Sequence, residues 1–239
     1  MGLADLQSGF QDAHQSCQEK QEAKREVEMA KREHKRFVGE AKKHLAKLPR
    51  FDLVIIACPL VLTMNVLNDV LKYNHNNVLV EKPITLKSEH AKELVELANA
   101  KGLMLMVGHT FEYNSEVHAL KQYIDSGELG DIYYLDTARL NLGLFQHDSN
   151  VLWDLAPHDI SILLYLLGKK PISVSAQGAP CVFEGIYDVA YLSLVFPDNI
   201  PAYVHVSWLD PCKVRRVTVV GSKKMAVYND MENEQKIKI

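Results

Sequence analysis

The sequence is poor in the features that mark secreted, membrane-spanning and metal-binding proteins. Its 239 residues include only four cysteines, which are widely spaced and form no Cys-x-x-Cys pair: Cys17, Cys58, Cys181 and Cys212. Such cysteines fit reduced thiols better than a disulfide framework or a zinc site, and we expect no metal. No apolar run approaches the ~20 residues of a membrane-spanning helix. The N-terminus lacks the basic and apolar regions of a signal peptide. We therefore expect a cytoplasmic protein.

An excess of one charge sign is also lacking. The chain has 27 Lys and Arg against 30 Asp and Glu, and 47% of its residues are hydrophobic. This balance gives no argument for binding nucleic acid or an anionic membrane. The length allows one large domain or two small ones, with a substantial core.

Residues 1–50 differ from the rest of the chain. Residues 18–47 are dense in charge and contain no proline and one glycine. Apolar residues recur there at helical spacing: Val27, Ala30, Phe37, Ala41, Leu45 and Leu48. The pattern predicts a charged amphipathic helix that docks on the body of the protein or on a partner. A basic patch for nucleic acid is the alternative, but acidic residues interleave too evenly to favour it.

Residues 51–110 alternate apolar runs with helical patterns. The runs FDLVIIAC (51–58), NVLVEKP (77–83) and LMLMVGH (103–109) are typical of parallel strands buried on both faces. The helix between the second and third runs is expected to have Ser88 as its N-cap and to end at Gly102. Strands and helices in this order predict right-handed βαβ units and a parallel sheet.

Residues 111–239 begin with a helix and then consist mostly of strands. The strand patterns include DIYYLDTARLNL, VAYLSLVF, AYVHVSWL and RRVTVVG, and one long helical pattern, residues 150–168, lies among them. This order predicts an α+β domain with a mixed or antiparallel sheet backed by helices.

Two groups of residues are candidates for chemistry. Lys82 ends a predicted buried strand in VLVEKPITL, where it is either part of an ordinary turn at Pro83 or a side chain delivered to a site. Asp154 and His158 are four residues apart, which places them on one helix face. This spacing suits an acid that orients an imidazole, with Pro157 tolerated near the helix start. The alternative is a capping aspartate and a surface histidine.

Four segments together resemble the Gfo/Idh/MocA family of NAD(P)-dependent oxidoreductases, and most of all its nucleotide-sugar members, which oxidise UDP-hexosamine-type substrates. These segments are VLVEKPITL, VGHTFEYN, SGELGDIYY and NLGLFQHDSNVLWDLAPHDISILLYLLG, and the resemblance runs from about Phe51 to the C-terminus. It implies an incomplete Rossmann-type dinucleotide-binding domain at 51–110. It also implies a sheet domain at 111–239 that binds the substrate and forms a homo-oligomer, with no nucleic acid or membrane partner.

The resemblance also implies roles for individual residues. Lys82, Asp154 and His158 match catalytic positions, with the histidine as acid/base. Positions that match cofactor contacts are Ala57, Cys58, Pro59, Glu81, Lys82 and His109. Positions that match substrate contacts are Phe111, Asn114, Arg139, Asn141 and His158. A lysine at the carboxyl end of a strand lies where open α/β sheets bind ligands, and its charge can stabilise a developing alkoxide.

The sequence departs from the family pattern at several places. No Gly-x-Gly-x-x-Gly occurs anywhere in it. Cys58 stands where the family has threonine, Thr63 where it has histidine, and Ser115 where it has proline. We expect a relative shortened at both ends. Two functions compete: hydride transfer between NAD(P) and a sugar or nucleotide-sugar hydroxyl, or a catalytically impaired relative that binds sugars or serves assembly. The two functions differ in whether they need the Gly-rich phosphate loop, which is the main anchor of the cofactor's pyrophosphate and is missing from this sequence.

Overall fold

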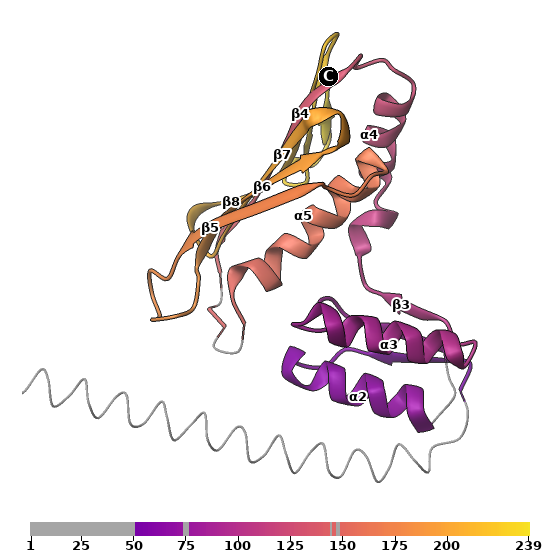
Figure 1. The fold of residues 1–239 in the computed structure, drawn as a ribbon. Coiled ribbons are helices and arrows are strands. Elements are labelled where there is room, and N and C mark those ends of the chain that lie inside the picture. The colour runs from indigo at the N-terminus through magenta and orange to yellow at the C-terminus, as the bar shows by residue number, and fades with distance from the viewer. Residues whose placement is uncertain (1–50, 74–76, 144, 147–148) are drawn as a thin grey trace, which may run out of the picture.

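The structure is a computed structural model that describes residues 51–73, 77–143, 145–146 and 149–239. The predicted helix within residues 1–50, and Cys17 with it, lie outside these residues. The described chain forms two sheets: a three-stranded sheet of order β1-β2-β3 and a seven-stranded sheet of order β10-β9-β8-β4-β7-β6-β5 (Figure 1).

The three-stranded sheet is parallel, as predicted. Its strands are β1 (Leu53–Ile56), β2 (Asn77–Val80) and β3 (Leu105–Val107). The connecting helices are α2 (Leu60–Tyr73) and α3 (Ser88–Ala100), which contribute to one core with the strands. Gly102 follows α3 with φ +63°, as predicted for a residue that ends a helix. The N-cap is Lys87 and not Ser88, whose hydroxyl instead donates to the Glu89 side chain.

Only one face of this sheet is well covered in the described structure. Val54 and Ile56 pack against the core shared with α2 and α3, whereas Leu53 and Ile55 are 50% and 65% exposed. Met104 is also exposed and lies two residues before Met106 of β3. The prediction that β1 is buried on both faces is therefore wrong for the described chain, because alternate residues of a strand point to opposite faces and no described helix covers the second.

The seven-stranded sheet is mixed. After η1 (Thr110–Tyr113) and α4 (Ser115–Asp125) come β4 (Ile132–Leu142), α5 (Val151–Leu167), β5 (Ser173–Ala179) and β6 (Val189–Phe196). The chain continues through η2 (Pro197–Asn199), β7 (Ile200–Ser207), β8 (Leu209–Gly221), β9 (Met225–Asn229) and β10 (Ile237–Lys238). β4 pairs with β7 in parallel and with β8 antiparallel. This arrangement confirms the predicted mixed sheet.

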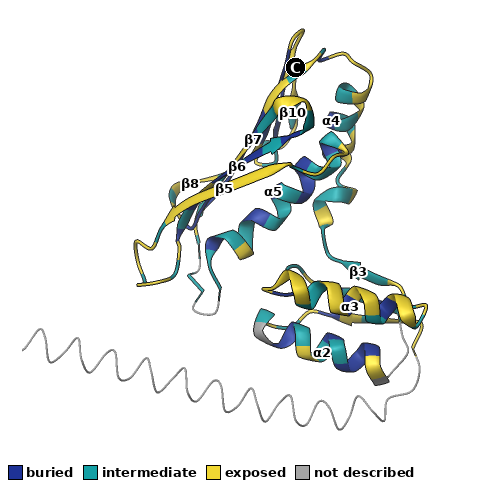
Figure 2. Ribbon diagram, viewed as in Figure 1, coloured by how far each residue is buried: buried dark blue, intermediate teal, exposed yellow. Residues whose placement is uncertain are grey.

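Helix α5 covers one face of the seven-stranded sheet (Figure 1). Leu135, Val204 and Val206 form one buried cluster with Ile162 and Leu166 of the helix. α5 ends at Gly168 with φ +62°, as the sequence predicted. Figure 2 shows that β5, at one edge of this sheet, is largely exposed.

The opposite face of the seven-stranded sheet carries aromatic side chains. Tyr191, Tyr203 and His205 point away from α5, and the rings of Tyr191 and His205 stack with centroids 4.0 Å apart. Tyr191 is 56% and Tyr203 45% exposed. An exposed aromatic sheet face of this kind is a feature of interaction surfaces.

Candidate active site

The predicted cofactor residues lie at one edge of the three-stranded sheet. Parallel strands end at the same edge, and backbone bonds hold these ends in register: Glu81 N donates to Ile56 O at 3.0 Å, and Gly108 N donates to Val80 O at 2.8 Å. The six residues directly after the strands are Ala57, Cys58, Pro59, Glu81, Lys82 and His109. Ligands of open α/β sheets bind outside this edge.

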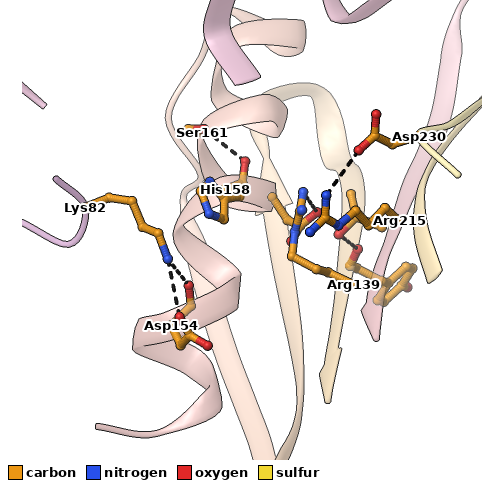
Figure 3. Close-up of polar contacts among 10 residues, drawn as sticks. Lys82, Arg139, Asp154, His158, Ser161, Arg215 and Asp230 are labelled. Atoms are coloured by element: carbon orange, nitrogen blue, oxygen red, sulfur yellow. Dashed lines mark hydrogen bonds and ion pairs between the residues drawn. The ribbon is translucent and has the colours of Figure 1, made fainter. Parts of the chain in front are cut away.

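Lys82 reaches from this edge to α5. Its Nζ donates to the backbone oxygen of Asp154 at 2.5 Å and lies 3.4 Å from Asp154 Oδ1, with the lysine side chain 16% exposed. Trp208 Nε1 donates to the other carboxylate oxygen at 3.0 Å. Asp154 therefore holds the lysine ammonium in place (Figure 3). Trp208 in turn holds Asp154. An ordinary turn at Pro83 does not account for Lys82, because its side chain reaches across to Asp154 of α5.

The predicted partnership of Asp154 with His158 is not what the structure shows. The carboxylate of Asp154 contacts Lys82 and Trp208, and Nδ1 of His158 is buried without a hydrogen-bond partner among the described residues. The i,i+4 spacing does place both residues on one helix. The spacing did not reveal that Trp208, which is buried, and Lys82, which comes from another element, would contact the Asp154 carboxylate.

The alternative reading of these residues also fails, because the cap of α5 is Asn150. Its Oδ1 accepts from Leu152 N at 3.1 Å and from Trp153 N at 3.2 Å. The helix begins where the pattern over residues 150–168 predicted, and Pro157 therefore lies inside it and not at its start. Proline has no N–H, so the carbonyl of Trp153 lacks its usual helical donor. Lys82 donates to the next carbonyl along the helix, that of Asp154, beside the Trp153 carbonyl that lacks its donor.

His158 is held in its neutral form. Burial is the largest cause, and together with the positive charges of Lys82 and Arg139 it lowers the pKa of His158 to about 3. Phe111 packs edge-on against the imidazole, with ring centroids 5.3 Å apart. In Figure 3 the imidazole lies between the Lys82–Asp154 pair and the arginines of the sheet. The imidazole is therefore neutral at pH 7, and its unpaired nitrogen is available as an acceptor for a ligand.

This low pKa predicts a pH dependence of stability. Between pH 6.5 and pH 3 the unfolded chain binds a proton at His158 that the folded chain does not, so stability falls as the pH falls. One such proton contributes up to ~1.4 kcal/mol per pH unit. We expect urea denaturation of wild type and His158→Gln, compared at pH 7 and pH 4.5, to show a smaller acid-induced loss in the variant. Equal losses in the two proteins would contradict the assignment.

Arg139 is fixed by its neighbours. Its Nε donates to Asp159 Oδ2 at 2.7 Å and its Nη2 to Asp159 Oδ1 at 3.3 Å, and both side chains are buried. Burial raises the pKa of Asp159, and the charge and hydrogen bonds of Arg139 oppose that rise. The guanidinium lies 4.5 Å from the Phe111 ring centre. Asp159 thus positions Arg139, which in turn supports the Phe111 ring that packs on His158.

These residues line a pocket of about 350 Å3. Four of the five predicted substrate residues are on its wall: Phe111, Arg139, Asn141 and His158. Asn114 is not on that wall, because its side chain caps α4 by accepting from Val117 N at 3.0 Å. Sequence analysis missed Lys213 and Arg215 of β8, which complete the pocket. Arg215 is the cross-strand partner of Arg139, so the register of β4 with β8, and no local sequence pattern, brings it to the pocket.

A second hollow of about 410 Å3 lies against another face of α5. Pro157, Ile160 and Leu164 contribute to it from the helix, together with Pro83 and His109 from the strand ends. His109 therefore lines a cleft, and its buried Nδ1 has no hydrogen-bond partner in the described part of the chain. The two hollows flank the helix that carries His158.

The site suits one half of a dinucleotide. Lys82 and His109 at the strand ends lie near His158 of α5, and Nδ1 of each histidine has no partner among the described residues and is left for a polar ligand. Cys58 and Thr63 contact each other: Cys58 Sγ lies 3.7 Å from Thr63 Oγ1, which donates to the Cys58 and Pro59 backbone oxygens at 3.3 Å. The polar side chains of this group fit the nicotinamide end of a dinucleotide cofactor. A Gly-rich phosphate turn is absent from the 239-residue sequence.

Two classes of site are not found in the described part of the chain. No group of three or more His, Cys, Asp or Glu there is arranged to hold a metal ion. No helix there is long and apolar enough to cross a membrane.

Two family models match the chain, one for each sheet region. The model of the oxidoreductase family with an NAD-binding Rossmann fold matches residues 8–109, and the model of the GFO/IDH/MocA C-terminal domain matches residues 117–227. The chain belongs to the Gfo/Idh/MocA oxidoreductase family. Its Rossmann-like sheet and its mixed sheet correspond to the two parts of that fold. The match begins at residue 8, so family similarity extends further towards the N-terminus than the motifs after Phe51 indicated.

Relatives in the Gfo/Idh/MocA family include dehydrogenases of sugars and inositols. The chain is 35% identical to the UDP-N-acetylglucosamine 3-dehydrogenase of Acidithiobacillus ferrooxidans, over 44% of this chain and 33% of that protein. It is 31% identical to the scyllo-inositol 2-dehydrogenase (NAD(+)) of Bacillus subtilis, over 54% of this chain and 39% of that protein. The matched regions span a third to a half of the first curated relatives.

A solved structure agrees with this assignment. The UDP-N-acetylglucosamine 3-dehydrogenase GnnA from Acidithiobacillus ferrooxidans superposes with a TM-score of 0.64 and 27% identity. The superposition covers 79% of this chain and 60% of that one.

Proposed function

We propose that the protein is an NAD(P)-dependent dehydrogenase that oxidises a hydroxyl of a sugar or nucleotide sugar. The observation that carries this proposal is the meeting of Lys82 and His158 at α5, beside the carboxyl ends of the parallel strands. Membership of the Gfo/Idh/MocA oxidoreductase family supports it. Residues 51–110 would bind the cofactor, and residues 111–239 would bind the substrate in the pocket beside His158. A cytoplasmic location is part of the proposal.

The roles of the residues follow from their charges. Residues 51–110 would hold the nicotinamide cofactor, which would supply the hydride acceptor for the carbon that bears the reacting hydroxyl. The neutral imidazole of His158 accepts the hydroxyl proton. The ammonium of Lys82, oriented by Asp154, stabilises the negative charge that develops on the oxygen. Phe111, Arg139 and Asn141 line the space in which the sugar lies. Ala57, Cys58, Pro59, Glu81 and His109 are proposed to contact the cofactor at the strand ends.

A second candidate function is favoured by the missing Gly-x-Gly-x-x-Gly, since the pyrophosphate then lacks its usual anchor. In that case the protein binds sugars without turning them over, or serves in assembly. A calorimetric titration with NAD+, NADH, NADP+ and NADPH separates the two candidates. A clear dissociation constant for one of them supports the dehydrogenase, and no heat with any of them supports the second function.

The proposed activity is tested by sugar-dependent formation of NADH or NADPH, followed at 340 nm. We expect Lys82→Met to lower kcat by about 10²-fold or more with little effect on KM, because the charge acts mainly in the transition state. The control is Lys92→Met, an exposed lysine of α3 that lines neither hollow. A Lys82→Met variant with the kcat of wild type would remove this lysine from the mechanism.

We also propose a homo-oligomer. Tyr191 and Tyr203 are exposed on the face of the seven-stranded sheet that α5 does not cover, and Leu53 and Ile55 are exposed on the other sheet. β1 is also an edge strand in the described sheet, and such edges promote association. Multi-angle light scattering should give a dimer or a larger assembly, and Tyr203→Lys should shift it towards the monomer. A monodisperse mass near 27.0 kDa for wild type would contradict the proposal.

A further inference from the structure

The wall of the 350 Å3 pocket that faces His158 is strongly basic. Three cations contribute to it, Arg139, Lys213 and Arg215, and no carboxylate is among its lining residues. Arg139 and Arg215 are cross-strand partners on β4 and β8, on the face towards α5. Lys213 lies two residues from Arg215, and alternate residues of a strand share a face.

The three cations differ in how far they are already neutralised. Arg139 is buried, and its Nε and Nη2 donate to Asp159. Its charge is therefore already neutralised by the Asp159 carboxylate. Arg215 has a looser partner, with its Nη1 3.4 Å from Asp230 Oδ2, and its side chain is 40% exposed. Asp230 has two further partners. Its Oδ1 accepts from the Tyr228 hydroxyl at 3.0 Å and from Lys236 Nζ at 3.2 Å. Lys213 is exposed and has no ion pair with a described residue.

We propose that Lys213 and Arg215 bind an anionic group, a carboxylate or a phosphate, on the sugar substrate, and that they thereby select charged sugars over neutral ones. This inference rests on the proposed function, because it names the substrate class of the same pocket. Guanidinium and ammonium donors form stronger hydrogen bonds with carboxylate and phosphate oxygens than with neutral hydroxyls. His158 lies on the same pocket wall, so the anionic group and the reacting hydroxyl belong to one ligand.

The size of the pocket favours a single sugar ring. Small-molecule sites occupy roughly 300–1,000 Å3, and about 350 Å3 is at the lower end of this range. A sugar acid or a sugar monophosphate therefore fits the enclosed part. A nucleotide sugar would place its diphosphate at Lys213 and Arg215 and leave the nucleoside outside the enclosed part.

Ligand-detected NMR titrations of the full chain test this inference without relying on turnover. The probes are glucuronate for the carboxylate, glucose 6-phosphate for the phosphate, and UDP-N-acetylglucosamine for the diphosphate. Glucose and myo-inositol are the neutral references. We expect at least one anionic probe to bind about tenfold or more tightly than glucose, the effect of one charge-assisted hydrogen bond. The probe that binds best identifies the source of the anionic group.

Two variants and a matched control complete the test. Lys213→Met and Arg215→Met should each remove most of the preference for the anionic probe while leaving the affinity for glucose unchanged. Asp230 keeps Tyr228 and Lys236 as partners in the second variant, so the fold should persist. Lys170→Met removes an equal charge from an exposed position after α5 and should preserve the preference. Equal affinities for charged and neutral sugars, or a preference that survives both variants, would overturn the inference.

The result also separates this inference from the proposed function. A preference for an anionic sugar that depends on Lys213 and Arg215, found together with no sugar-dependent reduction of NAD+ or NADP+, would support the inference and contradict the dehydrogenase. Turnover that is equally efficient with neutral and anionic sugars would support the dehydrogenase and contradict the inference.

Discussion

Replacing His158 by alanine should lower kcat by about 10²–10⁴-fold, the usual contribution of a positioned acid/base. The imidazole is neutral at pH 7, and its buried Nδ1 has no hydrogen-bond partner among the described residues, so this nitrogen is free to receive the proton of the hydroxyl. KM should change much less, because proton transfer contributes to the transition state and little to binding. Steady-state kinetics with varied sugar measures both constants.

The control for this variant is His118→Ala. His118 is exposed on α4 and stacks on Tyr165, with ring centroids 5.3 Å apart, outside the pocket that holds His158. Its replacement should leave kcat within a factor of two or so of wild type, as expected for a surface change away from the site. Equal losses in His118→Ala and His158→Ala would show that the effect is a general one of losing a histidine, and would remove His158 from the mechanism.

Replacing Asp159 by asparagine should destabilise the protein by about 3–5 kcal/mol, the cost of leaving one partner of a buried ion pair without the other. Arg139 and Asp159 are both almost fully buried, and the guanidinium has two hydrogen bonds to the carboxylate. The variant leaves a buried positive charge beside the Phe111 ring. Urea denaturation at pH 7 measures the difference in the free energy of unfolding.

The matched control is Asp198→Asn, which breaks the exposed pair between Asp198 and Lys169. Exposed pairs contribute only ~0–1 kcal/mol, so this variant should unfold close to wild type. Asparagine also tolerates the left-handed backbone at this position, where φ is 65°. A free energy of unfolding for Asp159→Asn within about 1 kcal/mol of wild type would contradict the role of the buried pair, because breaking such a pair typically costs more.

The sequence predicted the elements well where local patterns determine them. The apolar runs became β1, β2 and β3, and β6 has the predicted bounds, Val189–Phe196. Gly102 and Gly168 end their helices because both adopt a positive φ that glycine accepts at low cost. The burial of β1 was mispredicted, since periodicity reports how apolar a strand is and not which neighbours cover it.

The site was predicted in part because its residues come from distant segments. The family resemblance pointed to Lys82, Asp154 and His158. The hydrogen bond that holds Asp154 comes from Trp208, which is 54 residues away in the sequence. Asn114 was taken for a substrate contact, whereas its side chain caps α4. Lys213 and Arg215 join the pocket through the pairing of β4 with β8, which no local pattern reveals. Contacts across a sheet are set by register, and register is a property of the folded chain.

The most direct test of the central claim follows an isotope through the reaction. Wild-type protein is incubated with NAD+ or NADP+ and with carbon-deuterated glucose, glucuronate or myo-inositol, and the reduced nicotinamide is examined by mass spectrometry. The proposed reaction predicts that deuterium from the sugar carbon appears on the nicotinamide ring, and that His158→Ala greatly slows its appearance. Reduced cofactor without deuterium, or transfer that proceeds equally fast in His158→Ala, would contradict hydride transfer at this site.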